Sequence, residues 1–73
     1  MTYGKDRVYK KVEVIGVSRD TIENAVQAAV SKAHQTLKGL SWFEVDEVHG
    51  HIDADGKVTE YQVLLKVAFE LKD

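Results

Sequence analysis

The chain contains one tryptophan, Trp42, in the segment LSWFEV at residues 40–45. An indole ring is flat and apolar, so it can stack on a flat ligand or fill the contact between two subunits. Gln62 carries an amide that both donates and accepts hydrogen bonds, and it can therefore pair with the imide or amide edge of a heteroaromatic ring. These two residue types suit a flat heteroaromatic ligand. Burial of Trp42 against a neighbouring subunit is the alternative.

Two histidines, His49 and His51, lie two residues apart in the segment HGH. In a strand this spacing places both imidazoles on one face, as in a bidentate metal site. Asp53 continues the same face and His34 lies in a predicted helix, but the chain has no cysteine and no HExxH pattern to supply an evident third ligand. We therefore expect no bound metal and interpret the histidines as surface or pocket-edge residues.

The residue pattern offers no support for catalysis. Glu44, Asp46 and Glu47 lie along one predicted strand, where neighbouring side chains alternate between faces, so a positioned acid and base cannot be assigned to them. The five glycines are too dispersed for a phosphate-binding loop. We therefore expect a binding protein and not an enzyme.

The chain has 73 residues, and a domain of this length buries only about 60% of the surface that its unfolded form exposes. With no cysteine to form a disulfide, association with other copies is the remaining source of stability. The formal charge is −2, and the 10 Lys and Arg residues are scattered, which argues against binding to nucleic acid. No apolar run has the length of a signal peptide or a membrane span, so we expect a cytoplasmic protein without a membrane partner.

Two elements are predicted in the first half of the chain. Residues 8–17 alternate between apolar and polar side chains, which predicts a half-buried strand. Residues 21–38 carry apolar side chains at spacings of three and four, which predicts an amphipathic helix. Asp20 or Thr21 can cap its first turn, with Glu23 placed to close a capping box on Asp20, and Gly39 lies where a helix commonly ends.

Two further strands are predicted in the second half. From Trp42 onward the apolar positions change from odd numbers, at Phe43 and Val45, to even numbers, at Val48. A β-bulge near Asp46 and Glu47 would produce this change of phase. DADGK, residues 53–57, has the composition of a hairpin turn, and the segment after it alternates cleanly as a long strand with one apolar face.

The order of elements predicts an α+β fold of the β-α-β-β type. We expect the last strand to be the centre of a three-stranded antiparallel sheet, with the one amphipathic helix packed on one face. Trp42 then points away from Phe43, and Gln62 points away from Val63 and Leu65. Both site candidates therefore project from the face that the helix does not cover. We expect one domain spanning residues 1–73.

The segments VYKKVEVIGVS, LSWFEVDEVHGHI and YQVLLKVAFEL resemble dodecin, a small bacterial and archaeal flavoprotein family, from about residue 7 to residue 71. The resemblance implies a hollow homododecamer with flavins held in pairs at two-fold contacts between subunits. In that family the tryptophan of WFEV stacks on the isoalloxazine ring and the glutamine of YQV pairs with its polar edge. These positions are Trp42 and Gln62 here, and the expected flavin-contacting residues also include His49 and Glu47.

Two positions depart from many bacterial members of this family. His49 stands where they carry an arginine, so a contact to the flavin's ring edge or phosphate would come from an imidazole. Glu70 replaces the arginine of a final FRL segment, and this charge reversal leaves coenzyme A, which some members bind, as an open alternative.

The resemblance implies storage or sequestration of FMN, with riboflavin and FAD as other possible ligands, and quenching of the flavin's excited state. The alternatives from other classes are a small oligomeric flavin-dependent reductase or tautomerase-like enzyme, and a purely structural assembly with Trp42 at a protein interface.

Overall fold

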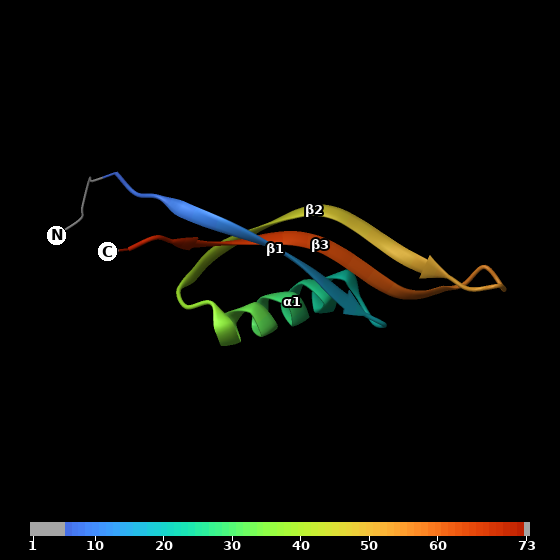
Figure 1. Cartoon of the computed structure of the whole chain (residues 1–73). Helices are drawn as coiled ribbons and strands as arrows, with labels where there is room; N and C mark the ends of the chain where they lie inside the picture. Colours follow the sequence, from blue (N-terminus) through green and yellow to red (C-terminus); the bar gives the residue numbers. More distant parts are fainter. Residues whose placement is uncertain (1–5, 73) are drawn as a thin grey trace.

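The computed structural model describes residues 6–72 (Figure 1). The elements follow the order β1 (Tyr9–Ser18), α1 (Ile22–Thr36), β2 (Leu40–Ile52) and β3 (Val58–Glu70). The predicted β-α-β-β order is confirmed. The predicted domain bounds of 1–73 include residues 1–5 and 73, which lie outside the described residues. Among residues 6–72, no helix has the length and apolar character that crossing a membrane requires.

The three strands form one antiparallel sheet in the order β1-β3-β2, so the last strand is central as predicted. β3 occupies the centre because its odd-numbered side chains form an uninterrupted apolar row. Val63, Leu65 and Val67 of this row are 0%, 0% and 1% exposed. On β1, Val12 and Val14 stand opposite Val67 and Leu65 and extend the same apolar face.

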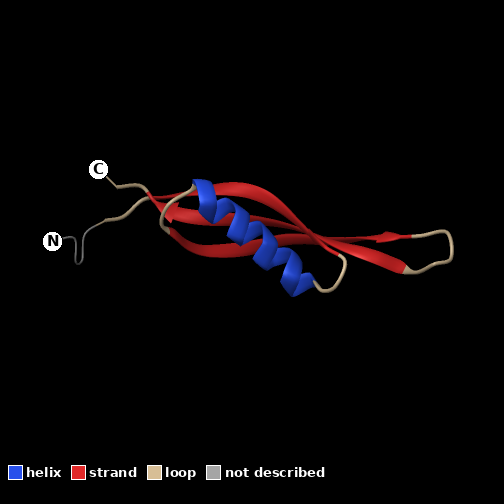
Figure 2. Cartoon of the chain, turned by 90° about the horizontal axis from the view of Figure 1, so that it is seen from below, coloured by secondary structure: helices blue, strands red, loops and turns tan. Residues whose placement is uncertain are grey.

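Helix α1 lies across the face of the sheet that carries these valines and leucine (Figure 2). Thr21, and not Asp20, is the N-cap: its hydroxyl accepts a hydrogen bond of 2.9 Å from the backbone N–H of Asn24. The predicted helix of 21–38 is longer than the observed one, because Leu37 adopts an extended conformation as the C-cap. Gly39 then takes a positive φ of 73°, which favours glycine and lets the chain turn into β2.

Small residues allow α1 to approach the sheet closely. Ala25, Ala29 and Ala33 form its buried stripe. Opposite them, Gly16 of β1 leaves no room for a side chain, because a Cβ added there would lie 1.9 Å from the carbonyl oxygen of Ala25. The helix therefore rests directly on the backbone of β1.

The predicted bulge in β2 is present. The pairing with β3 shifts between Val45 and Glu47, so Asp46 is the extra residue. Because of this shift, Phe43, Val45 and Val48 all lie on the helix side of the sheet. Two further shifts, between residues 40 and 42 and between residues 51 and 52, were not predicted.

The hairpin turn at 53–57 is also confirmed. The Asp53 carboxylate accepts hydrogen bonds from the backbone N–H groups of Asp55 (2.9 Å) and Lys57 (3.0 Å), and Gly56 has a φ of 80°. Pairing between β1 and β3 stops at Tyr61. The β2–β3 hairpin therefore projects beyond β1 as a two-stranded arm (Figure 1).

Candidate ligand-binding site

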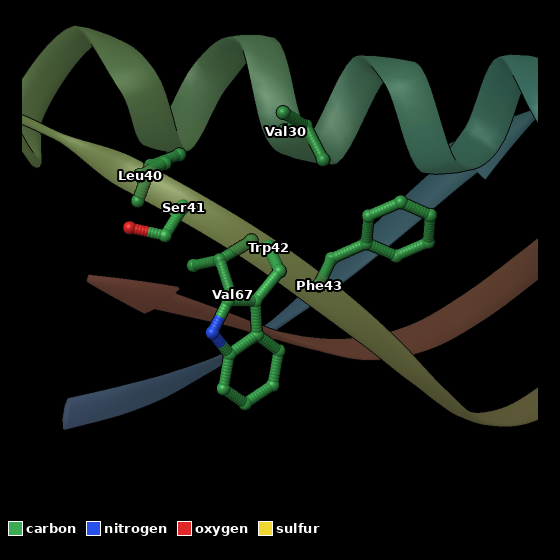
Figure 3. Close-up of a pocket in the computed structure, with 6 residues that line it drawn as sticks. All are labelled: Val30, Leu40, Ser41, Trp42, Phe43 and Val67. Atoms are coloured by element: carbon green, nitrogen blue, oxygen red, sulfur yellow. The ribbon is translucent and has the colours of Figure 1, made fainter. Parts of the chain in front are cut away.

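Trp42 lies on the uncovered face of the sheet, as predicted. It stands opposite Ala68 of β3, and its side chain is directed away from α1, whereas Phe43 is directed to the helix side (Figure 3). The residue is 45% exposed. Tyr9 and Lys11 of β1 flank its ring: the Tyr9 and Trp42 ring centroids are 6.1 Å apart, and the Lys11 Nζ is 5.8 Å from the indole centroid. β1 and β2 thus hold the indole in place and leave aromatic surface open to a ligand.

A small hollow of about 140 Å³ opens at the β2 edge beside Trp42 (Figure 3). It is lined by Val30, Leu40, Ser41, Trp42, Phe43 and Val67. Ligand pockets usually measure about 300–1,000 Å³. This hollow is therefore too small to enclose a cofactor-sized ligand, and Val30, Phe43 and Val67 in its lining lie on the helix side and not on the face that carries the indole.

Gln62, His49 and Glu47 gather farther along the same face. Gln62 stands opposite His49 of β2, and the His49 Nε2 lies 2.9 Å from the Glu47 Oε1. The Gln62 Nε2 donates a hydrogen bond of 2.8 Å to the Glu60 Oε2. The structure therefore brings three of the four predicted site residues together and adds Glu60. Alternation could have identified Glu60, since it precedes Gln62 by two residues and shares its face.

Trp42 is separated from this group. Its partner Ala68 is six residues from Gln62 along β3, and strand residues rise about 3.3 Å each, so about 20 Å of sheet lies between the two positions. The side chains of Trp42 and Gln62 in one chain thus do not contact each other. The sequence placed both on the correct face but did not indicate this separation.

Charged side chains occupy part of the sheet between them. Lys66 of β3 forms an ion pair with Asp46, the bulge residue, and Lys11 forms one with Glu44. The hydrogen bond from Lys66 holds the pKa of Asp46 below its ordinary value, and the same contact raises the pKa of Lys66. The bulge is therefore fixed to the central strand by a charge-assisted contact.

The two histidines of HGH share one face, as predicted, but they have separate partners. The His51 Nδ1 lies 2.9 Å from the Thr59 Oγ1, whereas His49 contacts Glu47. Asp53 is engaged by the hairpin turn. Within residues 6–72 the structure contains no group of three His, Cys, Asp or Glu side chains that could hold a metal ion.

Much of the apolar surface of the described chain lies open. On the helix side, α1 packs on β1 and β3, and Phe43, Val45 and Val48 of β2 remain 44–50% exposed. On the other side, Ile15 is 65% exposed. A surface of this kind is typical of a protein that buries it against a partner.

The family model for dodecin matches residues 8–72. The dodecin of Thermus thermophilus is 51% identical over 67 residues, which cover 92% of this chain and 96% of that protein. A crystal structure of a Thermus thermophilus protein is 50% identical, with a TM-score of 0.85 over 93% of this chain and 98% of the other. The calcium dodecin of Mycobacterium tuberculosis, described with a calcium-binding site, is 31% identical in its crystal structure, with a TM-score of 0.76 over 89% and 91% of the two chains. The chain belongs to the dodecin family.

Proposed function

We propose that this protein binds a flavin, with FMN as the main ligand, at contacts between identical copies, and stores it without catalysing a reaction. The observation that carries the proposal is the half-exposed Trp42, held on an uncovered sheet face in a member of the dodecin family. Gln62 on the same face supplies the hydrogen-bonding group that a flavin's imide edge requires. His49 and Glu47 are the proposed neighbours of that edge.

The distances favour a site built from more than one copy. One ring that stacks on Trp42 and pairs with Gln62 would have to span about 20 Å within one chain, which is longer than a three-ring isoalloxazine. Two copies facing each other can bring Trp42 of one near Gln62 of the other. The open apolar surface on both sides of the sheet supports a closed assembly, which we propose is a homododecamer.

The energetics agree with a shared site. Stacking on one aromatic surface contributes about 1–3 kcal/mol, whereas micromolar affinity requires about 8 kcal/mol. A single Trp42 is therefore insufficient. A ring covered on both sides by neighbouring copies and hydrogen-bonded by Gln62 has enough contacts to reach that affinity.

The same stacking supports quenching and sequestration of the flavin. An indole in contact with an excited isoalloxazine gives it an electron, and the electron then returns, so the excitation is lost as heat. Coenzyme A is a weaker proposal for this chain, because Glu70 places a negative charge near the end of β3.

A titration of FMN with the purified protein tests the proposal. We expect the flavin fluorescence to fall on binding and the loaded protein not to oxidise NADH. Turnover of NADH would favour a reductase, and indifference to FMN would favour a purely structural assembly. Addition of calcium in a parallel titration tests whether the property named for the Mycobacterium relative extends to this chain.

A further inference from the structure

We propose that Glu60 is a positioning residue that sets the orientation of the Gln62 amide, so that the site selects ligands with an N–H group at their ring edge. The inference rests on the proposed flavin site at Gln62. Glu60 and Gln62 are both half-buried on β3, and their side chains point to the same face.

The chemistry of the two groups determines the orientation. A carboxylate only accepts hydrogen bonds, whereas a glutamine amide has two N–H donors on nitrogen and an acceptor oxygen. The contact of 2.8 Å between Gln62 and Glu60 therefore has to involve the Gln62 Nε2. The opposite orientation would bring the Gln62 oxygen against the carboxylate, where neither group has a proton to donate.

Among the described residues, the cross-strand neighbour His49 makes no hydrogen bond to the Gln62 amide. His49 stands opposite Gln62 on β2. The Nε2 of His49 is already engaged with Glu47. Glu60 is thus the contact among the described residues that distinguishes the two ends of the Gln62 amide.

With one N–H directed to Glu60, Gln62 presents its oxygen and its second N–H to a ligand. This pair is complementary to an adjacent N–H and C=O of an imide, as at N3 and its neighbouring carbonyl in oxidised flavin. A free glutamine samples several rotamers and both amide orientations, and its ordering opposes binding. Glu60 therefore raises affinity by ordering Gln62 before the ligand arrives.

Riboflavin and 3-methylriboflavin are the probes for the test, since both are neutral and a change of charge at residue 60 affects them equally. The methyl group removes the N3 proton. In the parent protein we expect 3-methylriboflavin to bind about tenfold more weakly than riboflavin, because the Gln62 oxygen loses its donor. Equal binding of the two would overturn the inference and leave the proposed function intact. Binding of neither riboflavin nor FMN would remove the proposed function as well.

The variants Glu60→Gln and Glu60→Ala test the role of the carboxylate independently of each other. We expect each variant to bind riboflavin about three- to tenfold more weakly than the parent does, whereas its affinity for 3-methylriboflavin should change much less. The ratio of the two affinities should therefore shrink. Glu60→Asp keeps an acceptor-only group and should restore the ratio toward that of the parent. Glu70→Gln, on the same strand but away from Gln62, is the matched control and should leave the ratio unchanged. A parental ratio in both Glu60→Gln and Glu60→Ala would overturn the inference.

Discussion

Replacement of Trp42 by alanine removes the proposed stacking surface and leaves the fold in place. The indole lies outside the cluster buried under α1 and is 45% exposed in one chain. A lost stack of about 1–3 kcal/mol corresponds to an FMN dissociation constant about 5- to 150-fold higher. The alanine variant also lacks the indole that donates an electron to the excited ring. We therefore expect weaker binding together with brighter fluorescence from the flavin that remains bound.

Fluorescence titration measures the change in FMN affinity, and the fluorescence lifetime of the bound flavin measures the loss of quenching. Trp42→Phe should bind more tightly than Trp42→Ala, because a phenyl ring still stacks, yet its complex should be bright, because a phenyl ring is a poor electron donor. Gln62→Ala should weaken binding while the complex stays dark. Ser41→Ala, next to Trp42, removes a hydroxyl that donates only a long hydrogen bond of 3.4 Å to the Gly39 carbonyl, and it is the matched control. Light scattering should report the parental particle for every variant.

Binding of FMN by Trp42→Ala as tightly as by the parent, with equal quenching, would refute the stacking of Trp42 on the flavin. The indole would then fill a contact between subunits, and the flavin, if bound, would lie elsewhere.

Three further predictions concern the scaffold and the edge of the site. Gly16→Ala should lower the melting temperature of the protein, because its Cβ would lie 1.9 Å from the Ala25 carbonyl oxygen and overpacking of this kind costs about 1–3 kcal/mol; a parental melting temperature would contradict the close approach of α1. The hydrogen-bonded ion pair with Lys66 lowers the pKa of Asp46. The pair therefore stabilises the fold at pH values above the ordinary aspartate pKa of about 3.9, and this stabilisation is lost as the pH falls below that value and through the lowered pKa of Asp46. The melting temperature of Asp46→Asn should therefore be lower than that of the parent near neutral pH and equal to it in acid. The same difference in melting temperature at both pH values would argue against the ion pair. His49→Ala should weaken FMN binding in the same fluorescence titration, because His49 is a proposed neighbour of the flavin's ring edge, and a parental affinity would show that His49 does not contact the ligand.

Most of the fold could be predicted because its signals are periodic. The helical spacing of Ala25, Ala29 and Ala33 and the alternation along β3 each match one element and one buried face. The change of phase near Asp46 was sufficient to locate the bulge. The predicted end of α1 lies beyond the observed one, because Leu37 continues the apolar spacing although its backbone is already extended.

The candidate site could be predicted only in part. Alternation placed Trp42 and Gln62 on the uncovered face, but their separation depends on the register with β3, which pairs Trp42 with Ala68 and has no local signal in the sequence. The contacts of Tyr9 and Lys11 with Trp42 also arise from β1 and β2 being held beside the same central strand. Glu60 was identifiable from its spacing, yet its contact with Gln62 required the side-chain geometry.

Native mass spectrometry of the protein loaded with FMN tests the central claim most directly, because it measures the number of chains and of flavins in one particle. We expect a homododecamer that carries as many flavins as chains, and we expect flavin to be lost whenever the particle dissociates. FMN retained by an isolated chain would contradict a site shared between copies, and an intact particle that takes up no FMN would contradict flavin binding itself.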